Sequence, residues 1–336
     1  MSQKILVTGG TGFIGSHTCV ELQAAGYQVV ILDSLYNSQK SVLDAIASIS
    51  GQRSEFIQGD IRDAALLQQV FKQYQFQAVM HFAGLKAVGE SVAQPLNYYD
   101  NNVAGTVTLL QAMQVADVRT FIFSSSATVY GDPQTLPIPE DHPCSATNPY
   151  GHTKLVVEEI LANLYASETN WRIARLRYFN PVGAHPSGLI GEAPQGTPNN
   201  LMPYVAQVAS GQRQQVSVFG NDYDTPDGTG VRDYIHVMDL AQGHVAALRY
   251  CLANEPELLT VNLGTGRGYS VLEMIEAFSR SSGKPVAYQI APRRPGDIAS
   301  CWADTRLAET KLNWRADKDI QEMCDDAWRW EGRQSN

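Results

Sequence analysis

The sequence lacks the features that mark a disulfide-bonded, membrane-spanning or nucleic-acid-binding protein. Its five cysteines, Cys19, Cys144, Cys251, Cys301 and Cys324, lie far apart and form no C-x-x-C pair, which favours a reducing compartment and speaks against a zinc site. No apolar stretch approaches the roughly 20 residues of a membrane helix, and the N-terminus shows no secretory apolar region. The net charge of −9 leaves no basic excess for phosphate-backbone contacts. We therefore expect a cytoplasmic protein without a metal, membrane or nucleic-acid partner.

What is present is the composition of an ordinary globular protein. The chain has 336 residues, of which 44% are hydrophobic and 18% charged, and this length suits two domains or one large α/β unit. An anionic small substrate stays compatible with the acidic total, because local arginines can override the global sign.

The first motif is a glycine-rich turn between a short apolar strand, residues 4–7, and a helix predicted over residues 13–25. Gly9, Gly12 and Gly15 have G-x-x-G-x-x-G spacing. Glycine permits the tight turn and lets backbone N–H groups approach a pyrophosphate, and the helix directs its positive N-terminal end at the phosphates. The alternative for the glycines alone is a flexible loop.

An acidic residue follows the second predicted strand. Residues 28–32 end at Asp33, where a carboxylate would hold a ribose hydroxyl and favour NAD over NADP. Taken alone, Asp33 could be a solvated carboxylate. Strand, glycines, helix, strand and acid in this order predict a dinucleotide site.

Strands and helices then continue to alternate. Further strands are predicted at residues 54–58, 77–82, 120–123 and 171–177, and helices at residues 63–73, 95–116 and 150–167. This alternation predicts an α/β fold with a doubly wound parallel sheet, a Rossmann domain over residues 1–180. Residues 181–203 are rich in Gly, Pro and Asn, so we place a smaller mixed α/β substrate domain at 181–336, with some chain crossing back.

Tyr150 and Lys154 are four residues apart at the start of the helix predicted over 150–167, so they share one face. A nearby ammonium lowers the pKa of a phenol, because it favours the phenolate. Hydroxyl residues 124–126 follow the strand at 120–123, and the carboxyl ends of parallel strands are where such sheets bind ligands. The alternative is an ordinary aromatic–lysine pair, since Y-x-x-x-K is common by chance.

Several longer motifs carry a family resemblance. They are HFAGLKAVGES at 81–91, YYDNN at 98–102, FSSSATVYGD at 123–132, RYFNPVGAHPSG at 177–188, PNNLMP at 198–203, GTGVRDYIHVMD at 228–239 and PRRPGD at 292–297. With the glycine turn and Asp33, they make the chain resemble the extended short-chain dehydrogenases/reductases. The chain resembles the UDP-glucose 4-epimerase family very closely, from Ile5 to about Trp330.

That resemblance implies an isomerase that interconverts UDP-galactose and UDP-glucose through a 4-keto sugar, with tightly bound and recycled NAD. It implies that Tyr150 is the general base for the sugar 4-hydroxyl and that Lys154 lowers its pKa and binds the nicotinamide ribose. Ser126 would hydrogen-bond the reacting oxygen. The resemblance further implies a homodimer formed through the helices at 95–116 and 150–167.

The remaining site residues come from the glycine turn and the resemblance together. The cofactor site is expected to contain Gly9, Gly12, Phe13, Ile14, Gly15, Asp33, Ser34, Leu35, Tyr36, Asn37, Ser38, Asp60, Ile61, Phe82, Ala83, Gly84, Leu85, Lys86, Asn101, Ser126, Tyr150, Lys154 and Phe179. The UDP-sugar is expected to contact Lys86, Ser126, Tyr150, Asn180, Asn200, Leu201, Arg232, Arg294, Asp297 and Cys301.

Some of these residues have simpler alternatives. Asp60 could cap the following helix, Arg232 could form a surface ion pair with Asp233, and Arg294 could belong to a solvated basic pair. Residues 263–268 are glycine-rich, but a capping-box pattern at Ser270 follows them, so we expect a tight turn and no second nucleotide site.

Cys301 departs from the resemblance. The family has a bulky Tyr or a smaller residue at this position, which borders the sugar pocket near C2. A thiol should free space for an N-acetyl group, and we hypothesise activity on UDP-GlcNAc and UDP-GalNAc. The alternative is a buried apolar cysteine.

Two other functions compete. A nucleotide-sugar 4,6-dehydratase shares the fold and the Tyr–Lys pair, but its family supplies Asp-Glu after the hydroxyl residue, and here Ala127 and Thr128 follow Ser126. A non-catalytic NAD-sensing protein typically loses the active-site Tyr, and this chain keeps Tyr150.

Overall fold

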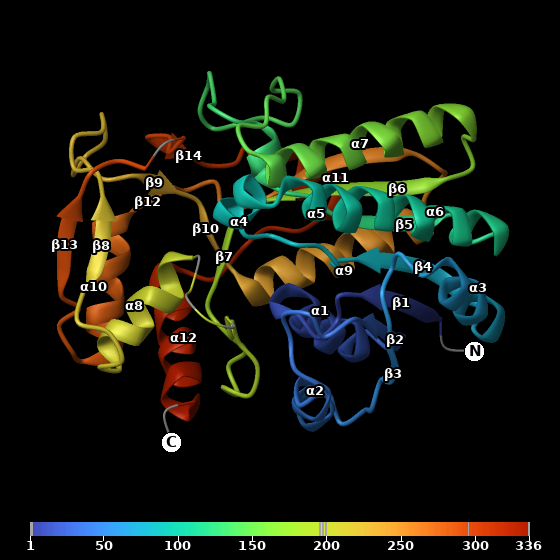
Figure 1. Ribbon diagram of the computed structural model, residues 1–336, viewed down its shortest axis with the longest axis horizontal. Coiled ribbons are helices and arrows are strands. Elements are labelled where there is room, and N and C mark those ends of the chain that lie inside the picture. The colour runs from blue at the N-terminus through green and yellow to red at the C-terminus, as the bar shows by residue number, and fades with distance from the viewer. Residues whose placement is uncertain (1–2, 195, 197, 199, 295, 335–336) are drawn as a thin grey trace.

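A seven-stranded parallel sheet forms the centre of the larger part of the molecule (Figure 1). The structure is a computed structural model that describes residues 3–194, 196, 198, 200–294 and 296–334. The strand order is β11-β6-β5-β4-β1-β2-β3. The strands are β1 (Lys4–Thr8), β2 (Gln28–Asp33), β3 (Glu55–Gln58), β4 (Phe76–His81), β5 (Thr120–Ser124), β6 (Arg172–Tyr178) and β11 (Leu258–Leu263). The predicted doubly wound parallel sheet is confirmed.

Helices cover both faces of this sheet, so the central strands β1, β4 and β5 are buried on both sides. One face packs against α1 (Phe13–Ala24), α2 (Val42–Ser50), α9 (Val237–Ala253) and α11 (Arg306–Leu312). The other packs against α3 (Ala64–Gln73), α6 (Gly105–Val115) and α7 (Pro149–Ser167). Strand β1 shows the alternation directly, because Ile5 and Val7 belong to the first core and Leu6 to the second.

The segment between β4 and α6 is less regular than the sequence predicts. Instead of one helix over residues 95–116, α4 (Val88–Ala93) and α5 (Pro95–Tyr98) are followed by a π-helical turn, η1 (Tyr99–Ala104), which leads into α6. A π-turn widens the helix by one residue, often beside a functional site, and periodicity does not reveal it.

A smaller unit lies beside the sheet (Figure 1). Its core is formed by α8 (Leu201–Ala209), α10 (Val271–Ser282) and α12 (Ile320–Gln334), with the parallel pair β8 (Val216–Phe219) and β13 (Tyr288–Ala291). Short strands connect the two parts, namely β7 (Asn180–Val182) with β10 (Tyr234–His236), and β9 (Val231–Arg232) between β12 (Tyr269–Ser270) and β14 (Ser300–Cys301).

The chain returns to the large sheet late. Helix α9 packs on α1, and β11 completes the sheet beside β6, although both follow residue 180. The division at residue 180 stays a prediction. The predicted capping box at Ser270 is confirmed, since Ser270 and Glu273 bond each other's backbone N–H. No helix in the described part of the chain is long and apolar enough to cross a membrane.

Candidate active site

A cavity of about 640 Å³ opens at the carboxyl ends of the central strands. Its lining includes these predicted cofactor residues: Gly9, Gly12, Phe13, Ile14, Gly15, Asp33, Ser34, Tyr36, Asn37, Ser38, Asp60, Ile61, Phe82, Ala83, Gly84, Leu85, Lys86, Asn101, Tyr150 and Lys154. Leu35, Ser126 and Phe179 do not line it. Within the described residues, no cluster of three or more His, Cys, Asp or Glu could hold a metal ion.

The glycine turn is packed so tightly that it leaves room only for backbone. Gly9 has a φ of +72°, and a Cβ there would lie 2.6 Å from the backbone nitrogen of Ala83. A Cβ on Gly15 would lie 2.2 Å from the carbonyl oxygen of Gly9. Gly12 precedes α1 without a side-chain cap, so the helix N-terminus faces the cavity. This cradle fits a diphosphate held by backbone N–H groups.

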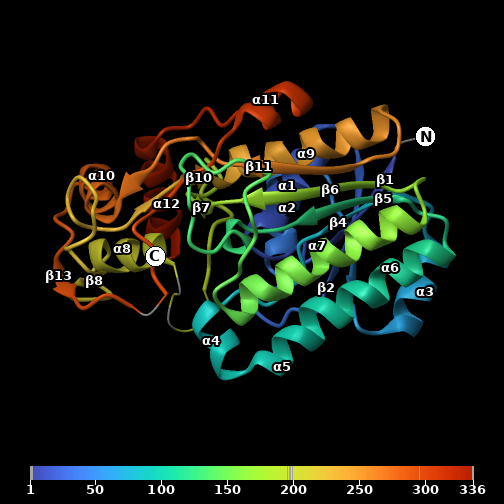
Figure 2. The same ribbon diagram turned by 90° about the horizontal axis from the view of Figure 1, so that it is seen from above.

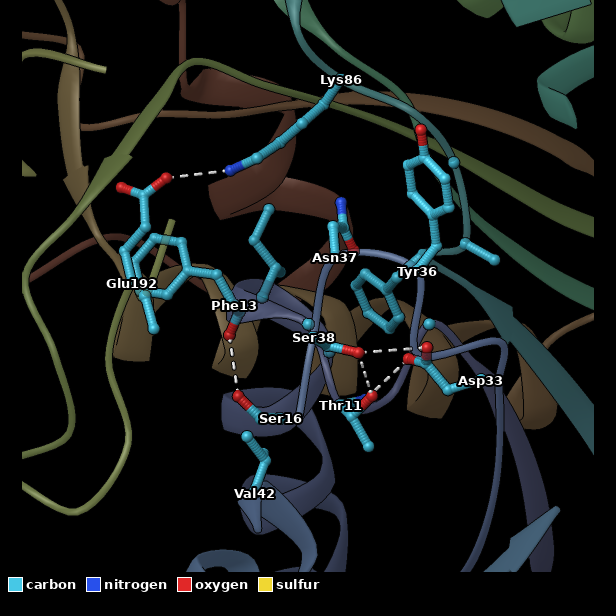
Figure 3. A pocket seen from close by; sticks show the side chains of 18 of the residues that line it. Thr11, Phe13, Ser16, Asp33, Tyr36, Asn37, Ser38, Val42, Lys86 and Glu192 are labelled. Carbon is cyan, nitrogen blue, oxygen red and sulfur yellow. Dashed lines mark hydrogen bonds and ion pairs between the residues drawn. The ribbon is translucent and has the colours of Figure 1, made fainter. Parts of the chain in front are cut away.

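Asp33 organises the end of β2 beside the glycine turn. Its carboxylate accepts hydrogen bonds from the backbone N–H of Thr11 at 3.0 Å and of Leu35 at 2.9 Å. The Ser38 hydroxyl donates to it at 3.2 Å and contacts the Thr11 hydroxyl at 2.7 Å (Figure 3). Asp33 is thus buried and bonded, which excludes the solvated carboxylate.

Asp60 lines the cavity but does not cap α3. That cap is Asp63, whose side chain accepts from the Leu66 N–H. Asp60 pairs with Arg62 instead, and this hydrogen bond, the largest cause, lowers the pKa of Asp60.

Tyr150 and Lys154 lie on one buried face of α7. The helix begins at Pro149, and the Asn148 side chain caps it by accepting from the Gly151 N–H at 2.9 Å. Lys154 donates from Nζ to the Ser124 carbonyl oxygen at 2.7 Å. Both side chains are buried in the cavity wall, so the pair is not an ordinary surface contact.

The phenol of Tyr150 belongs to a cluster of hydroxyl groups. Ser126 and Tyr178 both lie close enough to shift the pKa of Tyr150, and Ser124 likewise shifts the pKa of Tyr178. Ser126 Oγ accepts from the Thr128 N–H at 3.2 Å and from the Thr128 hydroxyl at 3.0 Å. The structure therefore brings the three predicted catalytic residues together. Sequence analysis missed Tyr178, although its place at the end of β6, on the carboxyl edge of the sheet, was a usable signal.

The pKa of Tyr150 moves opposite to the predicted direction. Burial, the largest cause, raises the pKa of Tyr150 well above 10, and Tyr178 adds to this, while Ser126 and Lys86 lower it. Burial also lowers the pKa of Lys154 to about 8, against the attraction of Glu158. In the protein alone, desolvation of the phenolate therefore dominates the pKa of Tyr150, and the lowering by Lys154 together with the nicotinamide stays a prediction.

An ion pair spans the cavity between its two walls. Lys86 Nζ lies 2.9 Å from Glu192 Oε1 (Figure 3). The Asn200 amide donates to the same oxygen at 2.6 Å. Burial opposes the charge of Lys86, but the Glu192 pair outweighs it and raises the pKa of Lys86. Lys86 and Asn200, both predicted to contact the UDP-sugar, are thus brought together. Glu192 was missed, and no motif distinguished it.

The predicted arginines lie in the smaller unit, outside the cavity lining. Both lie near Tyr234. Burial raises the pKa of Tyr234 to about 12, and the positive charges of Arg232 and Arg294 oppose this shift. Arg232 donates to the Val231 carbonyl at 2.9 Å, and Arg294 Nε pairs with Asp297 at 2.9 Å. The Arg294 guanidinium also stacks 4.6 Å from the Phe219 ring centroid.

Asp233 is not the ion-pair partner of Arg232. Its buried carboxylate accepts from the backbone N–H groups of Thr265 at 2.8 Å and Gly266 at 3.0 Å. These bonds hold residues 263–268 as the tight turn that the sequence predicts.

Cys301 lies on β14 opposite Arg232 in the parallel register. It is buried in an apolar cluster with Val129 and Phe179, and burial raises the pKa of its thiol to about 12. Asn180 begins β7, in the connection between the two units, and Leu201 begins α8, in the smaller unit. Asn199 and Pro295, within the quoted motifs, lie outside the described residues.

Comparisons with known proteins agree with this geometry. The chain matches the family model described as GDP-mannose 4,6 dehydratase over residues 6–327. It is 58% identical to a UDP-glucose 4-epimerase of Bacillus subtilis, covering 99% of this chain and 98% of that protein. The chain belongs to the UDP-glucose 4-epimerase family. The 4,6-dehydratase alternative is not favoured among these relatives.

Solved structures of UDP-glucose 4-epimerases superpose closely on this chain. The epimerase from Stenotrophomonas maltophila, solved with bound NAD and formylated UDP-arabinopyranose, is 53% identical with a TM-score of 0.97, covering 99% of both chains. The epimerase from Bifidobacterium longum, in complex with NAD+ and UDP, is 52% identical with a TM-score of 0.95, covering 98% of both chains.

Proposed function

We propose that this protein interconverts UDP-galactose and UDP-glucose by inverting the sugar at C4, with NAD bound in the cavity. The observation that carries the proposal is the buried group of Tyr150, Ser126 and Lys154 beside the cavity that the glycine turn and Asp33 line. The family membership and the ligands of the two related structures support it.

The chain's own residues would hold the cofactor. The glycine turn and the uncapped N-terminus of α1 suit the diphosphate, and Asp33 lies where a ribose hydroxyl is held. When bound, NAD supplies the acceptor and later the donor of the hydride at C4, so it is not consumed.

Tyr150 would move the proton. As a phenolate, its Oη would take the proton from the sugar 4-hydroxyl and return it after the 4-keto stage, with Ser126 favouring the ionised form. The high pKa of Tyr150 keeps the phenol protonated in the protein alone, so this role requires positive charge beside the ring, which Lys154 and the bound nicotinamide would supply. Lys154, held by the Ser124 carbonyl, supplies a fixed positive charge at this edge of the sheet.

The smaller unit would anchor the UDP portion. Arg232 and Arg294 supply planar guanidinium groups suited to a diphosphate, together with Asn180, Asn200 and Leu201. An anchor on the smaller unit and a proton-handling group on α7 leave the sugar free to present either face.

Cys301 supports a broader substrate range. Its buried thiol shares an apolar cluster with Phe179, where a tyrosine would occupy more space. We propose turnover of UDP-GlcNAc and UDP-GalNAc as well, and absence of any UDP-GlcNAc turnover would disprove it.

The assembly is proposed to be a cytoplasmic homodimer that packs through α5, α6 and α7. These helices lie side by side on one outer face (Figure 2). Val92 and Leu96, near the start of that face, have exposed fractions of 63% and 82%, which a partner would cover. Light scattering of the purified protein measures the assembly, and a monomer at micromolar concentration would contradict it.

The function is tested by incubating purified protein with UDP-galactose and no added NAD, followed by chromatography of the nucleotide sugars. We expect UDP-glucose to form. Activity that requires added NAD would contradict a tightly held cofactor, and no UDP-glucose even with added NAD would contradict the function itself.

A further inference from the structure

Three buried polar side chains follow one another at successive turns of α7. Tyr150, Lys154 and Glu158 are spaced four residues apart, so they share one face of the helix, and each has an exposed fraction of 6% or less. Tyr150 and Lys154 line the cavity, whereas Glu158, at 1% exposed the most buried of the three, lies behind it. A carboxylate buried in this way costs free energy unless other charges compensate for it.

The two charged side chains of α7 hold neighbouring residues at the end of β5. Lys154 Nζ donates to the Ser124 carbonyl at 2.7 Å, and the Ser125 hydroxyl donates to Glu158 Oε1 at 2.6 Å. Both serines are buried, with exposed fractions of 2% and 0%. Because water is excluded from this region, the ammonium and the carboxylate act on each other with little screening.

Glu158 also meets two arginines of β6. Its Oε1 accepts from Arg177 Nε at 3.0 Å and its Oε2 from Arg177 Nη2 at 2.6 Å, while Arg175 Nη1 lies 4.0 Å from Oε2. One negative charge thus faces three positive charges, on Lys154, Arg175 and Arg177. Guanidinium groups keep their protons at any ordinary pH, whereas a buried ammonium loses its proton readily. If the carboxylate were neutral, Lys154 would be the group that gives up its proton.

We propose that Glu158 is a positioning residue that acts through Lys154, as the counter-charge that keeps the Lys154 ammonium protonated beside Tyr150. This inference rests on the proposed function, because it concerns the charge that stabilises the Tyr150 phenolate. Burial lowers the pKa of Lys154 to about 8, and Glu158 opposes this shift. Without the carboxylate, Lys154 would be largely neutral at the pH where the phenolate needs it. The competing explanation is a buried ion pair of Glu158 with Arg177 that only stabilises the fold.

The other ionisable side chains that face this place from the sheet and from α9 do not titrate near pH 8 in the protein alone. Burial, the largest cause, lowers the pKa of His81 on β4 to about 3 and that of His244 on α9 to about 4. Burial also raises the pKa values of Tyr150 and Tyr178 above 10. Within the described part of the chain, an ionisation near pH 8 at this place therefore belongs to Lys154.

The experiment compares Glu158→Gln with Glu159→Gln, which removes the same charge from an exposed position of the same helix. Glutamine keeps the size of the side chain and one oxygen that can accept hydrogen bonds. The pH dependence of kcat for UDP-galactose is measured for each protein. Under the proposed function, ionisation of Tyr150 governs the rise of kcat with pH, and loss of the Lys154 proton governs its fall at alkaline pH.

We expect the alkaline fall of kcat to move at least about one pH unit lower in Glu158→Gln, because a neighbouring charge changes a pKa by about 1–3. In Glu159→Gln the fall should stay in place, since water and salt screen an exposed charge. Ser125→Ala is a second control, because it removes the hydrogen bond to Glu158 and keeps the carboxylate. It should lower kcat by a similar factor at every pH, without moving the fall.

A second measurement does not depend on turnover. Urea unfolding is followed against pH for wild type and for Glu158→Gln, each relative to the same protein that also carries Lys154→Met. In wild type, the stability due to Lys154 rises with pH from about 8, because the unfolded chain then binds more protons than the native protein. In Glu158→Gln this rise should begin at least about one pH unit lower.

A double variant covers the case in which Glu158→Gln yields no folded protein because Arg177 is left unpaired. Glu158→Gln combined with Arg177→Gln removes the buried pair as a whole, which proteins tolerate better than one unpaired charge. Burial and Glu158 are the causes that set the pKa of Lys154, so the alkaline fall should again move to lower pH.

Two results would overturn the proposal. One is an alkaline fall of kcat that does not move in Glu158→Gln or in the double variant. The other is a fall that moves equally in Glu159→Gln or in Ser125→Ala. Failure of the proposed function gives a different result, because the wild-type protein would then convert no UDP-galactose, and the unfolding measurements alone would decide the role of Glu158.

Discussion

The side chains on the two sides of the candidate site differ in how deeply they are buried and in which groups hold them. On the sheet side, Tyr150, Lys154 and Ser126 are each 6% exposed, and Lys154 and Ser126 are hydrogen-bonded to protein groups. On the side of the smaller unit, the Arg294 side chain is 56% exposed and pairs with Asp297 on its own loop. The proton-handling groups are therefore preorganised, whereas Arg294, one of the predicted anion anchors, is largely in solvent and would exchange its pairing with Asp297 for a ligand. Catalysis benefits from the first condition and substrate entry from the second.

The largest expected effect on the buried side of the site comes from Tyr150→Phe. Removing the hydroxyl should lower kcat by about 10²–10⁴-fold, the usual contribution of a general acid–base group. NAD content and the KM for UDP-galactose should change little, because the ring remains in the cavity wall. A kcat within about tenfold of wild type, measured by steady-state assay, would remove Tyr150 as the base.

A second test concerns the burial of Lys154. Its pKa falls from 10.5 to about 8 because burial disfavours the charged form. Between these values the unfolded chain binds more protons than the native protein. The stability of cofactor-free wild type, relative to Lys154→Met, should therefore rise with pH from about 8 to about 10.5, by about 3 kcal/mol in all. Urea unfolding across this range measures the difference. A pH-independent difference would contradict the buried ammonium.

The exposed side is tested with a matched pair of arginines. Arg294→Met should raise the KM for UDP-galactose about 10- to 100-fold with kcat nearly unchanged, as for a lost charge-assisted hydrogen bond. Arg293→Met is the control, since its guanidinium is similarly exposed, pairs with Asp222 and stacks on Tyr223. Equal KM values for the two variants would show that Arg294 has no special role.

The smallest expected effect belongs to Cys301→Tyr. The larger side chain should reduce kcat/KM for UDP-GlcNAc relative to UDP-galactose by about tenfold or more, because it fills the space proposed for the acetyl group. Cys301→Ala keeps that space and should leave the ratio unchanged. A ratio that is the same in all three proteins would favour the explanation that Cys301 is an apolar core residue.

The residues on the sheet side of the site were also easier to predict from the sequence than those on the side of the smaller unit. Spacing alone placed Gly9 and Asp33 in one cavity and Tyr150 and Lys154 on one helix face, because these relations are local and follow from the helix period and the strand-end rule. Burial could not be predicted in the same way. The raised pKa of Tyr150 depends on how many segments surround the phenol, and the sequence shows the neighbouring charges but not the exclusion of water.

Contacts across the chain account for the other omissions. Glu192 meets Lys86 over 106 positions, and no local pattern marks such a pair. The π-turn at Tyr99–Ala104 depends on the fit of Asn102 against Leu85 and Thr153, which exists only after α7 has packed. The substrate contact of Arg232 stays a prediction from the resemblance, and its alternative partner, Asp233, accepts a hydrogen bond from the turn at Thr265 instead.

Strand β11 lies 80 residues after its partner β6 in the sequence, and this order matters while the protein is being synthesised. Strand β6 is hydrogen-bonded to β5 on one side, but its other edge stays open until Leu258–Leu263 has left the ribosome. An open edge of a parallel sheet can pair with another chain. A nascent or truncated chain that ends before residue 258 therefore exposes a strand edge that can aggregate, although its first 180 residues contain all of the predicted cofactor residues.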